Sequence, residues 1–325
     1  MPSNNEPTLT KTAYSSTRYT REQLQQLKSC TDPDTGALYF MSNFLWIQHP
    51  IKGRMMFDPY PFQEELIGNY NSTRMSINMC GRQMGKTTVA AGYLLWFAMF
   101  IPDSTILIAA HKYTGAQEIM QRIRFAYEQV PDFIRAGVTS YNKGSLEFDN
   151  GSRIMSATTT ETTARGMSLS LIYLDEFAFV QPRVASEFWT SLSPTLATGG
   201  KCIITSTPNN DDDQFATIWR EANNNVDNFG NVQEIGKNGF KHYLATWDKH
   251  PERDEEWAKT EQSRIGEERF RREHMCEFII YDETLIDPLV LVGMEGKDPL
   301  FKMGQVRWYK KLSLIHISEP TRRLC

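Results

Sequence analysis

The 325-residue chain has little cysteine, no excess of positive charge and no long hydrophobic run. Its five cysteines are scattered without the spacing of metal ligands, and this usage fits a reducing compartment. With 35 basic and 39 acidic residues the net charge is −4, so composition gives no indication of nucleic-acid binding. Any contact with DNA must therefore be a local patch or a transient one.

The longest apolar stretch, residues 89–101, is too short to span a membrane, and no signal peptide is present. The sequence therefore predicts no membrane partner. Its length allows one large or two modest domains with a sizeable core.

Residues 80–88 read Cys-Gly-Arg-Gln-Met-Gly-Lys-Thr-Thr. A phosphate-binding loop has Gly, four residues and then Gly-Lys-Ser/Thr, and only the first position, Cys80, departs from that pattern. The alternation of apolar and polar residues over 73–80 predicts a strand before this phosphate loop, and residues 89–100 predict a largely apolar helix after it. That context places loop N–H groups and a helix N-terminus around the phosphates of a nucleotide.

Within the phosphate loop, Lys86 is predicted to reach the β- and γ-phosphates and the Thr87 hydroxyl to hold Mg²⁺. Gly85 lets the backbone approach a phosphate closely. The predicted nucleotide-binding residues of the loop are Gly81, Arg82, Gln83, Met84, Gly85, Lys86, Thr87 and Thr88.

A second motif, Asp175-Glu176, follows four apolar residues that predict a buried strand of a parallel sheet. Asp175 suits Mg²⁺ ligation, and Glu176 suits a base that activates the attacking water. Alone, a strand that ends in a solvated acidic turn would be the simpler interpretation. Combined with the phosphate loop, the two acids favour hydrolysis of a nucleotide.

Two further groups allow more than one interpretation. The amide of Gln63, in a helix predicted to begin at Pro61, suits recognition of the adenine edge, but a surface glutamine is equally compatible. Thr205-Ser206-Thr207 ends another predicted apolar strand and suits sensing of the γ-phosphate. From the residues alone, local hydrogen bonds to a turn are the better interpretation of these hydroxyls.

Strands predicted at 105–110 and 201–207 alternate with helices at 114–129 and 184–197. This alternation predicts an α/β fold with a mainly parallel central sheet covered by helices on both faces. Asn150-Gly151 predicts a hairpin between two short strands. A short capped helix is expected to begin after Thr20.

Taken in order, these motifs resemble the large terminase subunit of tailed bacteriophages, the T-even branch in particular. That protein is the motor that packages DNA into proheads. The resemblance runs from about residue 36 to 310 and is carried by the phosphate loop, the 143–152 hairpin, Ala164-Arg165-Gly166, Ile172-Tyr173-Leu174-Asp175-Glu176, Ile203 to Asn209, and Phe270 to Phe278.

The resemblance implies a P-loop NTPase fold with a small lid subdomain, and ATP and Mg²⁺ as cofactors. It implies hydrolysis of ATP coupled to translocation of double-stranded DNA into the prohead. The implied partners are DNA, the portal protein, the small terminase subunit and further copies of the chain in a ring on the prohead. The implied location is the cytoplasm of a bacterial host.

The resemblance also assigns residues. Gln63 becomes the adenine reader, and Arg82 a γ-phosphate sensor or a finger acting in cis. Lys86 and Glu176 become catalytic residues, Thr87 and Asp175 metal ligands, and Thr205, Ser206 and Thr207 the coupling motif. Arg165 suits a role in trans on a neighbour's nucleotide, although a structural arginine is equally compatible. Cys80 is in keeping with the family's relaxed first loop position.

The expected domain division follows the resemblance. It is residues 1–35, a disordered or adapter N-terminus; 36–60, a small lid segment; 61–235, the P-loop ATPase core; 236–285, the second part of the lid or a linker subdomain; 286–311, a linker toward a missing nuclease domain; and 312–325, an artefact. The last segment contains LSLIHISEPTR, which resembles a translated sequencing adapter. The family's endonuclease activity is therefore expected to be absent from this fragment.

Two alternatives remain at this stage. A helicase-like P-loop ATPase would need a second α/β lobe, and the residues after 210 do not offer one of sufficient length. A truncated lobe that binds nucleotide with little turnover is the other alternative.

Overall fold

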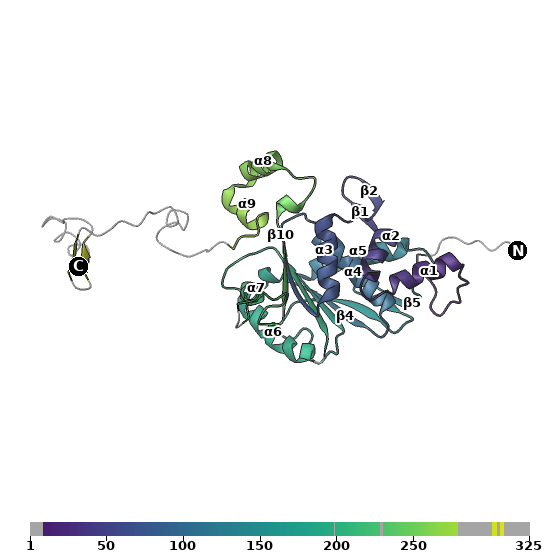
Figure 1. The fold of residues 1–325 in the computed structure, drawn as a ribbon. Helices are drawn as coiled ribbons and strands as arrows, with labels where there is room; N and C mark the ends of the chain where they lie inside the picture. Colours follow the sequence, from purple (N-terminus) through teal and green to yellow (C-terminus); the bar gives the residue numbers. More distant parts are fainter. Residues whose placement is uncertain (1–8, 198, 228–229, 279–300, 304–305, 309–325) are drawn as a thin grey trace. The chain divides into compact units, whose positions relative to one another are not determined.

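The computed structural model describes residues 9–197, 199–227, 230–278, 301–303 and 306–308 (Figure 1). The chain divides into two units, residues 1–279 and 280–325. Of the second unit, only the antiparallel strands β11 (Phe301–Met303) and β12 (Val306–Trp308) are described. The segment predicted to be an adapter artefact, 312–325, lies outside the described residues.

The first unit contains both helices and strands. Its helices are α1 (Arg21–Cys30), α2 (Gly36–Phe44), α3 (Pro61–Ser72), α4 (Lys86–Phe100), α5 (Tyr113–Gln129), the 3-10 turn η1 (Phe177–Phe179), α6 (Pro182–Ala197), α7 (Gln214–Asn223), the 3-10 turn η2 (Trp247–Lys249), α8 (Glu255–Ile265) and α9 (Glu267–Glu273). Its strands are β1 (Trp46–His49), β2 (Gly53–Met56), β3 (Met75–Cys80), β4 (Thr105–Ala110), β5 (Val138–Tyr141), β6 (Ser145–Phe148), β7 (Arg153–Thr158), β8 (Leu171–Asp175), β9 (Lys201–Ser206) and β10 (Lys241–Ala245).

Eight strands form the central sheet, in the order β10-β3-β9-β8-β4-β7-β6-β5. The first six of these pair in parallel, and β6 and β5 add an antiparallel end. The predicted α/β fold with a mainly parallel sheet is therefore confirmed. So is the hairpin at Asn150-Gly151, which joins β6 to β7.

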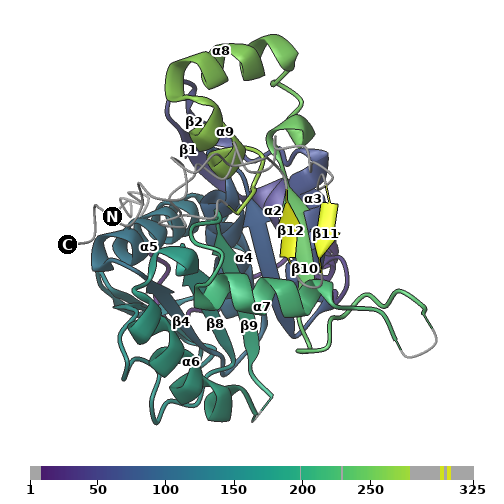
Figure 2. The ribbon, with the colours of Figure 1, turned by 90° about the vertical axis from the view of Figure 1, so that its left-hand side faces the viewer.

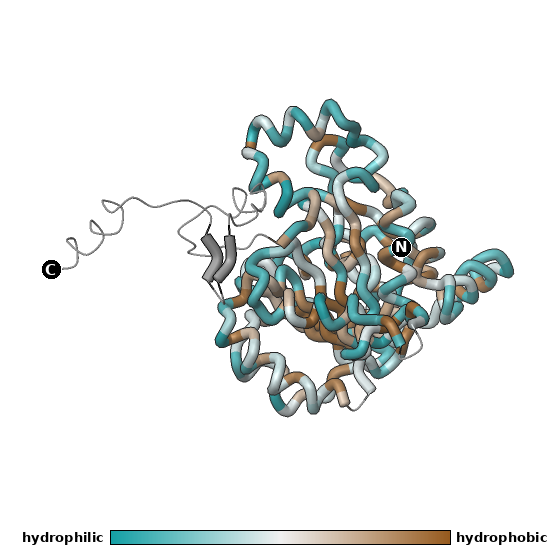
Figure 3. Tube along the Cα trace, turned by 60° about the vertical axis from the view of Figure 1, so that its left-hand side comes forward, coloured by the Kyte–Doolittle hydropathy of each residue, from teal (hydrophilic) through white to brown (hydrophobic). Residues whose placement is uncertain are grey.

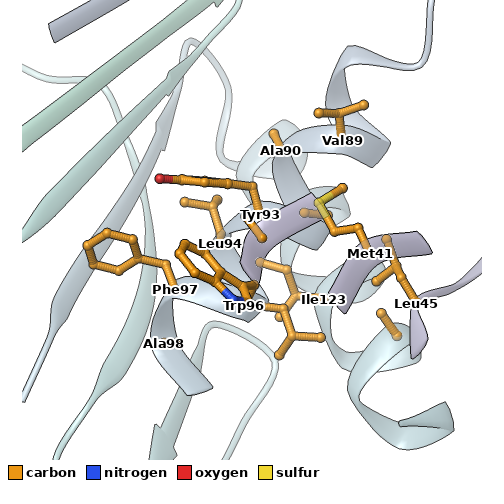
Figure 4. Packing of buried hydrophobic residues seen from close by; sticks show 14 of the residues in the cluster. Met41, Leu45, Val89, Ala90, Tyr93, Leu94, Trp96, Phe97, Ala98 and Ile123 are labelled. Atoms are coloured by element: carbon orange, nitrogen blue, oxygen red, sulfur yellow. The ribbon is translucent and has the colours of Figure 1, made fainter. Parts of the chain in front are cut away.

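Helices cover both faces of this sheet (Figure 1). One hydrophobic cluster packs α2, α3, α4 and α5 against one face, and a second packs α6 and α7 against the other. Helix α4 is buried almost all round, as its apolar sequence predicts. Figure 4 shows its side chains packed against Met41 of α2, Leu45 directly after α2, and Ile123 of α5. Complete burial of each large apolar side chain contributes about 1.5–3 kcal/mol, so α4 is held firmly.

The N-terminal segment is tied to this core. Helix α1 has the predicted capping box, in which Thr20 and Gln23 satisfy each other's backbone N–H groups. Before it, Thr12 forms a parallel bridge to Val138 on the outermost strand, β5. Lys11, 9% exposed, donates to the carbonyl of Asp132 at 2.8 Å. Residues 9–14 therefore cover part of the β5 edge.

Helices α8 and α9 follow the carboxyl end of β10 (Figure 2). Their surface is largely hydrophilic, whereas hydrophobic residues concentrate in the central strands (Figure 3). Within the described ranges, no helix is both long and apolar enough to cross a membrane.

Candidate nucleotide-hydrolysis site

The phosphate loop lies between β3 and α4, as predicted. Gln83 and Gly85 both have left-handed backbone conformations, with φ of 58° and 76°. Glycine tolerates this conformation without strain, and Gly85 is the N-cap residue that precedes α4. Cys80 is completely buried in the core beneath α4, and burial raises the pKa of its thiol to about 12. Its side chain is an inert packing group, which explains why the first loop position need not be glycine.

Three strands bring the predicted catalytic residues together. β9 lies between β3 and β8, so the strand that carries the coupling motif separates the phosphate-loop strand from the acidic strand. In the parallel register, Thr205 pairs with Asp175 and Ser206 pairs with Met79. Because the carboxyl ends of parallel strands meet at one edge, these side chains share a single site.

Lys86 and Glu176 form an ion pair, with 2.7 Å between Nζ and Oε1. The lysine side chain is 9% exposed and the glutamate side chain 28%. Burial opposes the charge on Lys86, but Glu176 and Asp175 outweigh it, so the pKa of Lys86 is raised. The lysine is therefore charged at neutral pH and is held by the carboxylate predicted to be catalytic.

Asp175 is buried and held by two hydroxyls. Its Oδ1 accepts hydrogen bonds from Tyr173 at 3.0 Å and from Thr205 at 3.2 Å, and the two hydroxyl oxygens are 2.6 Å apart. Burial and the neighbouring Glu176 raise the pKa of Asp175 to about 6. Within the described part of the chain no group donates to Oδ2, so this oxygen is available for a ligand.

Glu176 adopts a left-handed conformation, with φ 50° and ψ 45°. A non-glycine residue there costs about 1 kcal/mol or more, and such strain is typical of functional positions. The carboxylate is fixed from the β9 side, because Oε2 accepts from the Ser206 hydroxyl at 3.2 Å and from the Thr207 N–H at 3.3 Å. The residues predicted to form the coupling motif, Thr205 to Thr207, thus contact both acidic residues directly.

The donor set fits Mg²⁺. A carboxylate oxygen at Asp175 and a hydroxyl at Thr87, in the first turn of α4, are oxygen ligands of the kind that this ion prefers. No group of three His, Cys, Asp or Glu side chains within the described ranges forms a metal cage. A magnesium ion here would therefore take its remaining ligands from water and nucleotide phosphates.

The outer side of the phosphate loop is covered by the last residue of β10 and by the chain after it. Gly81 N–H donates to the carbonyl of Ala245 at 2.9 Å, and Arg82 N–H donates to the carbonyl of Glu273 at 2.7 Å. The Arg82 guanidinium pairs with the Glu273 carboxylate at 2.5 Å. Since its side chain is 61% exposed, this ion pair contributes little to stability.

Gln63 lies beside the loop, but its amide is occupied by protein groups. Nε2 donates to the carbonyl of Met84 at 3.1 Å, and Oε1 accepts from the N–H of Tyr60 at 3.1 Å. Gln63 is 6% exposed, so it is not a surface glutamine. Recognition of adenine by this residue stays a prediction.

Arg165 lies in the turn before β8 and is exposed. It lines an open hollow with Ser186, Glu187 and Thr190 of α6. Among the described residues nothing joins Arg165 to the Lys86–Glu176 pair. Its action in trans stays a prediction.

Three residues of the site were not predicted from sequence. They are Tyr173, which holds Asp175; Glu273, which holds Arg82; and Arg253, whose guanidinium reaches carbonyls of the phosphate loop. Tyr173 could have been found, because a tyrosine hydroxyl inside a buried strand needs a partner. The other two follow the phosphate loop by more than 150 residues; Glu273 lies within the Phe270–Phe278 motif but had no predicted role, and Arg253 belongs to no motif.

The chain matches the family model described as terminase large subunit, T4likevirus-type, N-terminal, over residues 77–288. The large terminase subunit of Thermus virus P23-45 is 25% identical over 262 residues, which cover 73% of this chain and 53% of that protein. The chain thus spans about half the length of the curated relatives that it matches.

Solved structures share the fold. The ATPase domain of the Thermus phage P74-26 large terminase has a TM-score of 0.54 at 23% identity, with 69% of this chain and 95% of that chain covered. The large terminase of the thermophilic bacteriophage D6E, solved with ADP, has a TM-score of 0.53 at 12% identity, with 68% and 54% covered.

Proposed function

The chain belongs to the T4likevirus-type large terminase subunits, and we propose that it carries their ATP-hydrolysing motor. In this proposal, hydrolysis of ATP drives translocation of double-stranded DNA into the prohead. The portal protein, the small terminase subunit and further copies of the chain in a ring are the proposed partners, in the cytoplasm of a bacterial host. The family match and the geometry around Lys86 support it.

One observation carries the proposal, namely the Lys86–Glu176 ion pair at the start of α4. The phosphates of a bound nucleotide compete with Glu176 for the lysine, because they lie at the same helix N-terminus. When Lys86 turns to the phosphates, the carboxylate of Glu176 is released to accept a proton from the attacking water. Nucleotide binding thereby frees the Glu176 carboxylate to act as a base, and without nucleotide the carboxylate stays paired with Lys86.

The remaining residues of the edge support this step. Asp175 and Thr87 would hold Mg²⁺, which when bound neutralises charge on the phosphates. Ser206 and Thr207 hold Glu176, so a movement of the carboxylate reaches β9 directly. We assign these hydroxyls, with Thr205, to coupling. We also propose that Arg82 reaches the γ-phosphate once it leaves Glu273, and that Arg165 acts on a neighbouring copy.

The test is steady-state ATP hydrolysis by the purified chain, with and without duplex DNA and portal protein. We expect hydrolysis by the wild type, and in Lys86→Ala a loss of binding of a fluorescent ADP analogue by about tenfold or more. Lys259→Ala removes an exposed lysine of α8 and serves as the matched control. The fold of each variant is checked by its melting temperature.

Three outcomes are informative. Normal nucleotide binding by Lys86→Ala would contradict the assignment of the phosphate loop. Binding without turnover by the wild type would favour the truncated nucleotide-binding lobe. Turnover that responds neither to DNA nor to portal protein would leave an ATPase and remove the packaging role from this chain.

A further inference from the structure

Three successive carbonyls of the phosphate loop are bound from outside by two side chains. Arg253 donates from Nη1 and Nη2 to the carbonyl of Arg82, at 3.2 Å each, and from Nη2 to the carbonyl of Gln83 at 3.2 Å. Gln63 donates to the next carbonyl, that of Met84, at 3.1 Å. The carbonyls of residues 82, 83 and 84 therefore all face these two donors.

This arrangement fixes the direction of the loop N–H groups. In a planar trans peptide, the N–H of the following residue points opposite to the carbonyl. The N–H groups of Gln83, Met84 and Gly85 consequently point away from Arg253 and Gln63. The left-handed conformations at Gln83 and Gly85 belong to the type of backbone nest that gathers N–H groups around an anion.

Arg253 is itself held in place. Its guanidinium lies 4.4 Å from the ring centroid of Trp257, in the first turn of α8, and Nη1 also contacts the sulfur of Met84 at 3.4 Å. Among the described residues no carboxylate forms an ion pair with it, so its hydrogen-bonding capacity is directed at the loop. Burial lowers its pKa, yet an arginine stays charged at neutral pH.

We propose that Arg253 is a positioning residue that holds the phosphate loop in its anion-binding conformation before a nucleotide arrives. This inference rests on the proposed function, since the anion is the phosphate chain of a nucleoside triphosphate. The planar guanidinium suits the task because it reaches two adjacent carbonyls at once while it stacks on an indole. A loop that is already ordered binds the nucleotide more tightly, because no binding free energy is lost in ordering the loop.

The proposal separates Arg253 from the catalytic residues. Its contacts are with the loop backbone, Met84 and Trp257 and not with Lys86 or Glu176, so its loss should weaken nucleotide binding more than turnover at saturation. A merely structural arginine would instead lower the stability of the whole unit and leave the loop no more mobile than the rest.

The experiment compares Arg253→Ala, Arg253→Lys and the control Arg269→Ala, which removes an exposed arginine of α9. The first readout needs no nucleotide. It is the rate at which trypsin cleaves the Arg82–Gln83 bond, mapped by mass spectrometry, because local cleavage follows local opening. The second readout is the affinity for a fluorescent ADP analogue together with kcat at saturating ATP.

In Arg253→Ala we expect cleavage at Arg82 to rise about tenfold and the ADP affinity to fall about tenfold, with kcat changed less than about threefold. Arg253→Lys should give intermediate values, because lysine keeps the charge but lacks the planar guanidinium that reaches two carbonyls at once. Arg269→Ala should match the wild type in every readout.

Unchanged cleavage at Arg82 in Arg253→Ala would overturn the proposal. Faster cleavage at every site, with a lower melting temperature, would also overturn it, since the role would then be global. The experiment tests the proposed function and the positioning role of Arg253 independently. A wild type that binds no nucleotide refutes the proposed function, while cleavage at Arg82 still decides the positioning role.

Discussion

The phosphate loop has an inner and an outer side, and the two differ in chemistry. The inner side faces the strand ends and carries groups that can react or bind a metal, namely Lys86, Asp175 and Glu176. The outer side faces the chain after β10. There, Arg253 and Glu273 bind backbone carbonyls and N–H groups of the loop.

The difference suggests that the inner side carries the reacting groups and the outer side positions the loop. Lys86 and Glu176 of the inner side neutralise each other, and in the proposed function a bound nucleotide separates them. Outer residues bind the loop backbone without touching the reacting centre. Substitutions on the inner side should therefore alter turnover, or the stability that is lost by burying a charge. Substitutions on the outer side should alter the affinity for nucleotide.

The largest expected effect lies on the inner side. Glu176→Gln keeps an oxygen for Ser206 and Thr207 but removes the base, so turnover should fall on the order of 10²-fold or more. Nucleotide affinity should stay the same or rise, because Lys86 loses its competing carboxylate. Steady-state kinetics and ADP binding measure both, with Glu255→Gln, an exposed glutamate of α8, as control. Turnover within threefold of the wild type would refute Glu176 as the base.

Asp175 allows a test of how much the buried charge on the inner side lowers the stability of the fold. Its pKa is raised from 3.8 to about 6, so between these values the folded chain binds more protons than the unfolded chain. The group's contribution to stability therefore falls as the pH rises through this window. A pKa difference of about two corresponds to about 3 kcal/mol. Asp175→Asn, neutral at every pH, should thus raise the free energy of unfolding by up to about 3 kcal/mol at pH 7.5.

The same substitution should stabilise less at pH 4.5, where the wild-type carboxyl is already protonated in the folded chain. Urea unfolding without nucleotide at both pH values provides the measurement, and Glu255→Gln again serves as control. A stabilisation that is equal or larger at pH 4.5 would show that Asp175 is not a strained, buried charge.

The smallest expected effect concerns Tyr173, which touches the inner side from within the sheet. Tyr173→Phe removes one of two hydrogen bonds to Asp175, so the Mg²⁺ concentration for half-maximal ADP binding should rise about three- to tenfold. Tyr70→Phe is the matched control, because the buried Tyr70 hydroxyl has no hydrogen-bond partner among the described residues. Equal Mg²⁺ dependence in both variants would remove Tyr173 from the metal site.

The inner side could be predicted from sequence because its residues follow apolar strands. A buried parallel strand is short and continuous, and its carboxyl end lies at the edge of the sheet where ligands bind, so Asp175 and Thr205, each at the end of such a strand, could be assigned to the same edge. The register confirms this, with the two residues paired. The buried helix after the loop was predicted on the same ground, since residues 89–100 have no polar face.

The contacts of the outer side could not be predicted, since no local pattern indicates that Arg253 or Glu273 reaches the phosphate loop. Arg253 lies in a segment of mixed charge that contains no recognised motif, and its contacts depend on where η2 turns after β10. Gln63 shows a related limit. A role near the nucleotide was predicted for Gln63, but its hydrogen bond to the Met84 carbonyl is visible only in the structure.

The bridge between Thr12 and Val138 bears on how the protein can be handled. β5 ends the sheet, and an uncovered end strand presents free N–H and C=O groups that pair readily with another molecule. A chain shortened past Tyr14 would keep every residue of the nucleotide site. It would nevertheless be prone to precipitate, because the segment that prevents edge-to-edge growth of the sheet would be gone.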